Sequence, residues 1–391
     1  MELEVIKKDG THEDWCFDKI KVAIDKATKR ANAKYPEWKL WQIEGYIEGI
    51  LYNKTDVTAE ALHGYVIEAL NKYLPEVGKA YQEYRDYKNT YAKAFESVKS
   101  EADTVLLLGD RENANFDSSL ISTKGSLIKG YLTKELYKQF YLSNKEKELV
   151  KRGDIYIHDL RDMIFNSFNC CLFDIGSVLK GGFEMSNVKY TEPTSVLSAL
   201  QVIGDITLVA TAQQFGGFTL AEIDKVLLPY AKKTYDNAFK KYSEQCNMEY
   251  DESCAMAMGD LKRELEQGFQ SLELKLNTVP CSRGDFAFTT LTFGTWDIMM
   301  DDLNRDIMLM IGKTILKTRM KGHGGKQVVF PKLVFLYDEN KIRNDEGHKE
   351  LFDLAVDCSS KCMYPDYLSL NHGKVGEIYH RTGAITSPMG R

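Results

Sequence analysis

Residues 1–90 combine a short alternating segment with a hydrophobic pattern of helical period. Glu2–Lys8 alternate as a strand does, and Asp9-Gly10 after them is a strong signal for a hairpin turn. After Asp18, which we take as an N-cap, apolar side chains recur at three- and four-residue spacing, and that pattern returns three more times. The apolar positions are Ile20, Ala23, Ile24 and Ala27; Ile43, Ile47, Ile50 and Leu51; Leu62, Val66, Ala69 and Leu70; and Val77, Ala80, Tyr81 and Tyr84. The pattern predicts a β-hairpin followed by a small helical bundle.

Residues 91–391 read as a second, larger region in which apolar helical runs alternate with short extended segments. A polar, lysine-rich stretch at 87–103 predicts a helical connector into it. The predicted helices are 127–140, 193–215, 220–242, 261–276 and 296–321, the predicted strands are 154–157, 286–293 and 327–337, and 371–391 is predicted as loop. This alternation favours an α/β core with buried strands and helices outside.

Composition limits the class of protein. The chain has 391 residues, of which 43% are hydrophobic and 28% charged, as in a folded soluble protein of two or three domains. Its net charge of −6 gives no electrostatic reason to expect nucleic acid as a partner. The N-terminus is charged, and the longest weakly polar segment, Val196–Phe215, contains Gln201 and Asp205. We therefore expect no signal peptide, no membrane partner and a cytoplasmic location.

The chain contains eight cysteines, which a reducing compartment would keep as thiols. No two cysteines have CxxC spacing, so a zinc ribbon is not expected. Cys358 and Cys362 are four residues apart and can share one face of a helix. We interpret them as part of a half-buried helix rather than as ligands.

Three lysines surround the predicted turn near the N-terminus. Lys7 and Lys8 lie on the predicted strand, and Lys19 lies in the first turn of the following helix. Polyphosphate binding needs several cations that converge on one point, and the amides at a helix N-terminus add to it. From spacing alone, however, solvent-facing charges are the more frequent explanation of such lysines.

The surrounding sequence resembles the ATP-cone found at the N-terminus of many ribonucleotide reductases. The resemblance is carried by V-x-K-x-D-G at 5–10, FDKI at 17–20, VTAEALHGYVIEAL at 57–70 and VGKAYQEYRDYK at 77–88. It implies that residues 1–90 bind ATP or dATP as an overall activity switch. By position it assigns nucleotide contacts to Lys7, Glu13 and Lys19, with Lys8 and Lys79 as weaker candidates.

A histidine–aspartate pair precedes two adjacent cysteines in the segment 153–183. His158 and Asp159 end the predicted strand 154–157, and Cys170 and Cys171 follow. The residues leave three interpretations open, namely a thiol activated for nucleophilic attack, a metal site, or a satisfied polar turn. For an isolated pair the polar turn is the commonest. No serine-hydrolase or kinase phosphate-loop pattern competes with them.

An ordered series of motifs over nearly all of residues 113–391 resembles the anaerobic (class III) ribonucleoside-triphosphate reductases. The series comprises NAN at 113–115 with Asp117, YIHD at 156–159 with the later NC segment, QQFGGF at 213–218, RGDFAFTTLTFG at 283–294, RMKGHGGKQVVFPKLVF at 319–335 and KCMYPDYLS at 361–369. The resemblance implies an α/β fold in which an N-terminal, mostly α ATP-cone (residues 1–90) precedes the first half of a ten-stranded glycyl-radical-enzyme barrel (residues 91–391).

The resemblance also implies a radical reaction that reduces ribonucleoside triphosphates to deoxyribonucleotides. A cysteine thiyl radical takes a hydrogen atom from the ribose 3′ carbon, the 2′ hydroxyl leaves as water, and a second cysteine returns a hydrogen atom. Cys170 matches this second cysteine, and Cys171 is the alternative; a buried, small apolar side chain is the preferred interpretation of Cys171. Residues 277–294 and 322–331 are expected to shape the pocket. Helices in 195–242 are expected to carry a dimer interface and a specificity-effector site.

The chain departs from the family pattern at its last residues, Pro388-Met389-Gly390-Arg391. Family members read P-M-G-C-R there, and that cysteine carries the radical. The zinc-binding cysteines and the glycyl-radical loop are expected further on, in a part that this chain does not contain. The chain alone is therefore expected to be inactive.

The glycine-rich turn Gly322–Gly325 has two possible roles. Its backbone could approach a phosphate, or it could form a tight connection between a helix and a strand.

The partners implied by the resemblance are a ribonucleoside triphosphate substrate, a complementary C-terminal reductase chain, an iron–sulfur S-adenosylmethionine activase and a second copy in a homodimer. The alternative function is that of an inactive fragment that acts only as an ATP/dATP-binding module. A related glycyl-radical lyase is a third hypothesis, and the ATP-cone argues against it.

Overall fold

The computed structural model describes residues 3–107, 117–166, 168–185, 187–214, 216–281 and 284–388. The chain divides into two compact units, Met1–Ser100 and Glu101–Arg391. The motif at 113–115, together with Phe215, Arg283 and the last three residues, lies outside the described residues.

A three-stranded sheet of order β2-β1-β3 opens the first unit. β1 (Glu4–Ile6) and β2 (His12–Asp14) form the predicted hairpin, and β3 (Asp56–Thr58) pairs with β1 in parallel. Gly10 has φ of +81° in the connecting turn, a conformation that glycine adopts without steric cost. The hairpin prediction is confirmed.

Four helices complete the first unit, and each buries one apolar face in a common core. They are α1 (Phe17–Arg30), α2 (Trp38–Leu51), α3 (Ala59–Tyr73) and α4 (Pro75–Leu107). Thr58 caps α3 by accepting a hydrogen bond from the Ala61 backbone N–H. The Asp18 prediction is wrong, because Cys16 is the N-cap of α1 and Asp18 lies in the first turn, where its charge still suits the helix dipole.

The second unit contains a five-stranded parallel sheet of order β10-β9-β8-β7-β4. The strands are β4 (Cys171–Phe173), β7 (Phe218–Leu220), β8 (Thr289–Phe293), β9 (Lys332–Tyr337) and β10 (Asp366–Ser369). Every residue of β7 and β8 is buried, as in parallel sheets covered on both faces. This confirms the α/β class, with five strands where the first half of a ten-stranded barrel was expected.

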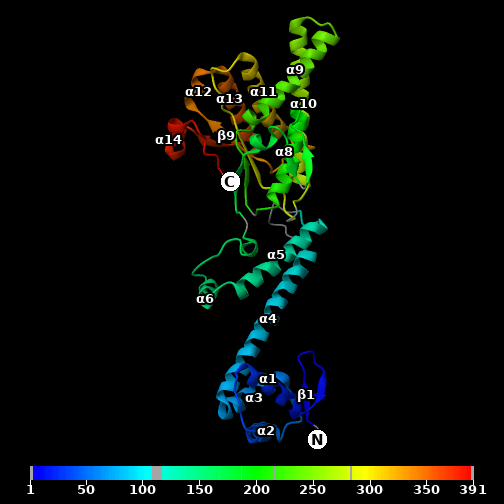
Figure 1. Cartoon of the computed structure of the whole chain (residues 1–391), viewed down its shortest axis with the longest axis vertical. Helices are drawn as coiled ribbons and strands as arrows, with labels where there is room; N and C mark the ends of the chain where they lie inside the picture. Colours follow the sequence, from blue (N-terminus) through cyan, green and yellow to red (C-terminus); the bar gives the residue numbers. More distant parts are fainter. Residues whose placement is uncertain are drawn as a thin grey trace. The chain divides into compact units, whose positions relative to one another are not determined.

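Helices make up most of the rest of the second unit (Figure 1). The larger ones are α5 (Ile121–Phe140), α6 (Asn144–Arg152), α8 (Val196–Thr211), α9 (Ile223–Lys240), α10 (Tyr250–Thr278), α11 (Asp302–Lys321), α13 (Glu346–Cys362) and α14 (Gly373–Thr382), and the short elements are α7 (Ile175–Leu179), α12 (Glu339–Asn344) and the hairpin β5 (Phe183–Met185) and β6 (Val188–Tyr190). None of the helices in the described ranges combines the length and hydrophobicity that a membrane span needs.

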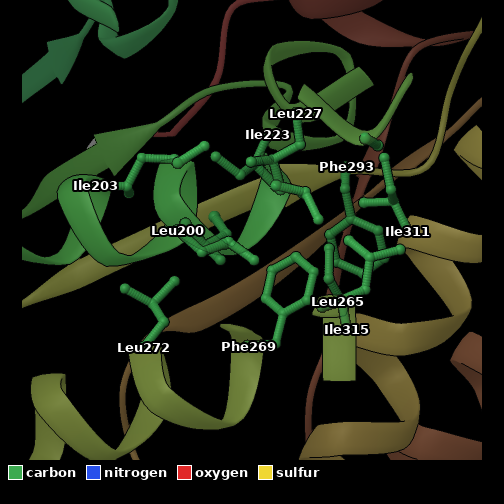
Figure 2. Close-up of a cluster of buried hydrophobic side chains, with 14 of the residues drawn as sticks. Leu200, Ile203, Ile223, Leu227, Leu265, Phe269, Leu272, Phe293, Ile311 and Ile315 are labelled. Carbon is green, nitrogen blue, oxygen red and sulfur yellow. The ribbon is translucent and has the colours of Figure 1, made fainter. Parts of the chain in front are cut away.

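The core of the second unit lies where α8, α9, α10 and α11 meet the sheet. Figure 2 shows Leu200 of α8, Leu227 of α9 and Phe269 of α10 converging near Phe293 of β8. α8 and α10 approach closely at Gly268, where an added Cβ would lie 2.4 Å from a Leu200 methyl carbon. The long apolar periods of these segments therefore correspond to real buried faces.

Two local predictions fail in the second unit. Residues 154–157 form no strand, because Tyr156 is 86% exposed and the Asp154 N–H closes the end of α6 by donating to Leu149 O. Residues 371–391 are not all loop, since α14 occupies the middle of the segment. Its half-buried Val375, Ile378 and Tyr379 follow a helical period that the neighbouring glycines concealed.

Candidate functional site

A cavity of about 580 Å³ lies in the first unit between the hairpin turn, α1, the start of α3 and α4. Seven cationic side chains line it, and Glu60 is the only carboxylate among the described residues that do. The cations are Lys7, Lys8, Lys19, Lys26, Arg30, Arg85 and Lys88. Cations that converge in this way favour a ligand with several negative charges.

Helical periodicity explains why the cations meet. Lys19, Lys26 and Arg30 are seven and four residues apart, so they share one face of α1. Arg85 and Lys88 lie three residues apart on the face of α4 that also lines the cavity. The cavity is therefore the space between two cationic helix faces, closed at one end by the lysines of the hairpin.

Glu13 of β2 forms ion pairs with both Lys7 and Lys19. Its side chain is 25% exposed, whereas those of Lys7 and Lys19 are 48% and 65% exposed. Glu13 itself does not line the cavity. In this arrangement the carboxylate offsets part of the repulsion between two lysines that lie at the mouth of the site.

Aromatic side chains form part of the cavity wall. The Tyr81 hydroxyl lies 2.7 Å from Nδ1 of His63, and burial raises the pKa of Tyr81 to about 12. Tyr84 lies on the next turn of α4 and is 38% exposed. A ring beside cations can contact a flat, uncharged part of a ligand while the cations hold its charged part.

The structure brings together four of the five predicted nucleotide contacts. Lys7, Lys8 and Lys19 line the cavity, and Glu13 contacts two of them. Lys79 is exposed in the first turn of α4 and lies outside the lining residues.

Sequence reasoning missed Lys26, Arg30, Arg85 and Lys88. The spacing of Lys26 and Arg30 from Lys19 would have placed all three side chains on one face of the predicted helix. The two residues of α4 carried no comparable signal, because their place depends on how α4 packs against α1.

The two predicted cysteines lie where β4 runs parallel to β7. Cys170 precedes β4, and its Sγ accepts a hydrogen bond from the Gly217 N–H at 3.2 Å. Cys171 begins β4, and its thiol donates to Oε1 of Gln214 at 2.9 Å. Gln214 is buried and donates through Nε2 to Gly217 O at 2.7 Å, which fixes its orientation. Both cysteines are half-buried rather than enclosed.

Gly216 allows the chain to pass close to these cysteines. An added Cβ would lie 2.2 Å from Asn169 Oδ1, 2.3 Å from the Asn169 carbonyl oxygen and 2.6 Å from Cys170 Sγ. Gly216 of the QQFGGF motif therefore has a steric role beside the cysteine site.

Burial raises the pKa of the Cys171 thiol, and the neighbouring Cys170 adds to the shift. A raised thiol pKa keeps the sulfur protonated and makes it a poor nucleophile. The local environment thus suits a thiol that retains its hydrogen.

His158 and Asp159 form an ion pair at 2.5 Å in a turn outside the sheet. The Asp159 carbonyl accepts hydrogen bonds from the N–H groups of Asp162 and Met163, and the His158 side chain is 78% exposed. Among the described residues, no three His, Cys, Asp or Glu side chains gather as a metal site would require. These contacts are those of a satisfied polar turn.

A second cavity, of about 430 Å³, lies at the carboxyl ends of β4 and β7. Asp174, Glu222 and Lys225 contribute its polar lining. In open parallel sheets ligands bind at this end of the strands. The nearby Asp224 is 1% exposed and accepts from the Gly294 N–H at 2.8 Å, and burial raises its pKa to about 6.

The remaining motifs make structural contacts. His323 and Lys326 exchange backbone hydrogen bonds of 2.9 and 3.1 Å, so Gly322–Gly325 forms a tight connection between α11 and β9. Asn277 accepts from the N–H groups of Val329 and Phe330 and fixes the segment that leads into β9. Cys358 is buried and Cys362 half-buried on α13, as interpreted from their spacing.

Comparison with known proteins supports these features of sequence and fold. Residues 112–390 match the family model described as anaerobic ribonucleoside-triphosphate reductase, and residues 3–90 match the ATP cone domain. The chain therefore belongs to the anaerobic ribonucleoside-triphosphate reductase family, a family of oxidoreductases.

The matched relatives are proteins named anaerobic ribonucleoside-triphosphate reductase. The Haemophilus influenzae protein is 32% identical over 99% of this chain and 54% of its own length. The Escherichia coli protein is 30% identical over 100% of this chain and 54% of its own length. The Enterobacteria phage T4 protein is 34% identical over 71% of this chain and 44% of its own length. The chain thus spans about half the length of the curated relatives it matches.

Among solved structures, the anaerobic ribonucleotide reductase from Thermotoga maritima in complex with dATP and CTP aligns with a TM-score of 0.43. Its sequence identity is 15%, and the alignment covers 73% of this chain and 49% of that chain.

Proposed function

We propose that this chain supplies the nucleotide-sensing domain (residues 1–90) and the opening part of the catalytic barrel (residues 91–391) of an anaerobic ribonucleoside-triphosphate reductase. ATP or dATP binds in the cavity of the first unit as an activity effector. The observation that carries the proposal is the convergence of seven cations and two tyrosines on one cavity of about 580 Å³. That volume is within the usual range of small-molecule sites.

The chemistry of the lining accounts for both halves of a nucleotide. Lys7, Lys8 and Lys19 at the hairpin end are the proposed phosphate contacts, and Lys26 and Arg30 extend the cationic surface along α1. The phosphates compete with Glu13 for Lys7 and Lys19, which makes Glu13 part of the site without lining it. Tyr84 is the more exposed of the two tyrosines of α4, and its ring beside Arg30 is the aromatic surface proposed for the nucleoside.

Cys170 is the proposed donor of the returning hydrogen atom, and Cys171 is the alternative. Both precede or begin the edge strand β4, and both are accessible in part. Hydrogen-atom return requires an S–H bond, which is the state that the surroundings of Cys171 favour.

The whole reaction is proposed to need further partners. These are a ribonucleoside triphosphate substrate, a complementary C-terminal chain that supplies the thiyl-radical cysteine, the zinc site and the glycyl radical, an iron–sulfur S-adenosylmethionine activase, and a second copy in a homodimer. The proposed location is the cytoplasm.

Calorimetric titration of the full chain with ATP and dATP tests the effector site. Lys19→Ala and Lys26→Ala should each weaken binding about tenfold or more, because a charge-assisted hydrogen bond contributes roughly 1.5–3 kcal/mol. Lys21→Ala is the matched control, since it removes the same charge from α1 at a position outside the cavity. Equal affinities in all four proteins would refute the site.

Reconstitution with the complementary chain and the activase separates the enzyme from the alternative of an inactive nucleotide-binding module. Anaerobic reduction of a ribonucleoside triphosphate supports the enzyme. A complex with a formed glycyl radical but no reduction would leave only the binding module.

A further inference from the structure

Three buried threonines lie on one face of the five-stranded sheet. β7 pairs with β8 so that Thr219 is opposite Thr290, and Thr292 follows two residues later on the same side. All three are 0% exposed. The residues that alternate with them, such as Leu291 and Phe293, pack into the core of the second unit. The threonines therefore lie on the opposite face of the sheet, which we call the threonine face.

The chain that follows α14 contacts the threonine face. The Thr219 hydroxyl donates a hydrogen bond to the Pro388 carbonyl oxygen at 2.7 Å. The hydroxyl oxygens of Thr292 and Ser387 lie 3.3 Å apart, and Ser387 is only 4% exposed. Thr292 also accepts from the Glu222 N–H at 2.8 Å, which fixes the position of its hydroxyl group. Two neighbouring strands thus hold residues 387 and 388 through side chains that are distant in sequence.

Cys170 lies toward the same face. Cys171 is paired with Phe218, which belongs to the core, and Cys171 packs against that core. Leu172 is paired with Thr219. Because side chains alternate along a strand, Cys170 and Leu172 lie on the side of Thr219, opposite to Cys171. The proposed hydrogen donor and the segment held by that threonine therefore share one face of the sheet.

The hydroxyl groups on this face are better explained by the segment than by the sheet. Strands that are buried on both faces of a parallel sheet are usually rich in valine, isoleucine and leucine. A buried hydroxyl is favourable only where it forms a hydrogen bond. Thr219 meets that condition through Pro388, whereas Oγ1 of Thr290 has no hydrogen-bond partner in the described ranges. The threonine face thus offers hydrogen bonds to whatever chain crosses it.

We propose that Thr219 and Thr292 are positioning residues for the reaction of Cys170. By holding residues 387 and 388 against the threonine face, they determine how the chain that follows Pro388 approaches Cys170. The inference rests on the proposed function, in which Cys170 returns the hydrogen atom and the P-M-G-C-R pattern of the family puts the radical-bearing cysteine shortly after this proline. Reacting groups must be held close together, so a loosened segment slows the reaction without weakening substrate binding.

Thiol labelling of the full chain tests whether the hydroxyl groups hold the segment. Ser387→Cys places a thiol at a buried position, where iodoacetamide reacts only when the segment opens. Thr219→Val removes one hydroxyl at nearly constant shape and should raise the labelling rate about two- to tenfold, as expected for the loss of one hydrogen bond. Thr290→Val is the matched control, because the hydroxyl that it removes makes no hydrogen bond with a described residue. Peptide mapping follows residue 387, and the buried Cys358 reports general unfolding.

Kinetics of the reconstituted reductase test the consequence for the reaction. Thr219→Val should lower kcat about tenfold or more and leave KM nearly unchanged, because the hydroxyl positions the segment and does not bind substrate. Thr219→Ser keeps the hydroxyl and should retain most of the parent kcat. Thr289→Val is the control for the same substitution on the other face of the sheet, where the Thr289 hydroxyl donates to Ala287 O at 3.0 Å. It should leave both constants at the parent values.

The outcomes separate this inference from the proposed function. Equal labelling of residue 387 in the Thr219→Val and Thr290→Val proteins would overturn the inference, and so would a parallel rise at Cys358. Equal kcat values for Thr219→Val and Thr289→Val would also overturn it. A parent enzyme that forms the glycyl radical but reduces no nucleotide would instead refute the proposed function, and the labelling rates would still decide whether the hydroxyl groups hold the segment.

Discussion

The guanidinium carbon of Arg30 lies 3.7 Å from the centroid of the Tyr84 ring. This contact joins the cationic face of α1 to the aromatic face of α4 across the wall of the cavity. It holds one of the seven cations at a fixed place before any ligand arrives. The contact also makes Tyr84 a positioning residue for Arg30.

Tyr84→Leu should weaken ATP binding by about two- to fivefold, because a partly exposed cation–π contact contributes roughly 0.5–1 kcal/mol. Tyr84→Phe keeps the ring and should retain the parent affinity. Calorimetric titration of the three proteins measures the difference. Equal losses in both variants would show that the hydroxyl, and not the ring, is what matters.

Gly216→Ala should destabilise the second unit by about 1–3 kcal/mol, since the new methyl group overlaps the Asn169 backbone and the Cys170 sulfur. Gly259→Ala is the control, because an added Cβ there meets nothing within 4 Å and the residue lies inside α10. Thermal unfolding followed by circular dichroism checks both. A melting temperature for Gly216→Ala at or above that of the control would contradict the described geometry.

The two adjacent cysteines should differ in reactivity and in function. Cys171 should react slowly with iodoacetamide at pH 8, because burial raises its pKa and lowers the thiolate fraction. Peptide mapping after timed alkylation of the native chain measures this rate against that of the denatured chain.

In the reconstituted enzyme, Cys170→Ser should abolish ribonucleotide reduction, whereas Cys171→Ser should retain most of it. The reverse result would assign the hydrogen donor to Cys171. Nucleotide affinity serves as the control, since both cysteines lie outside the first unit.

Asp224 should make the stability of the second unit depend on pH. Burial raises its folded-state pKa to about 6, above the ordinary value of 3.8. Between these pH values the folded state binds more protons than the unfolded state. The stabilisation by protonated Asp224 is therefore complete below about pH 4 and is lost as pH rises through about 6. The shift corresponds to about 3 kcal/mol.

Asp224→Asn removes this titration. Denaturant unfolding at pH 4.5 and 7 should show the parent losing stability relative to the variant as pH rises. A difference between the two proteins that stays constant with pH would refute the assignment.

Long helices were predictable because their hydrophobic period extends over many turns. α8, α10 and α11 fall within or around predicted runs, although α10 begins eleven residues before its run. β4 and β7 were not predictable, because strands of three residues carry no measurable period. Their strand conformation depends on neighbours that are distant in sequence.

The candidate sites were predictable to a similar, partial extent. Lys7 and Lys19 stood out because a turn signal lies between them. Arg85 and Lys88 did not, because only the packing of α4 against α1 brings them to the cavity. The position of Cys170 beside Gly217 likewise depends on the parallel pairing of β4 with β7.

The Tyr81–His63 contact has a consequence for selectivity. A phenol with a pKa of about 12 keeps its hydrogen at neutral pH, and its 2.7 Å contact with Nδ1 occupies that nitrogen of the His63 ring. In the tautomer that accepts the phenol hydrogen at Nδ1, the imidazole donates through Nε2. Together with the lysines and arginines it makes a wall composed mainly of donors, which rewards ligands rich in acceptor oxygens and penalises those whose own groups also donate.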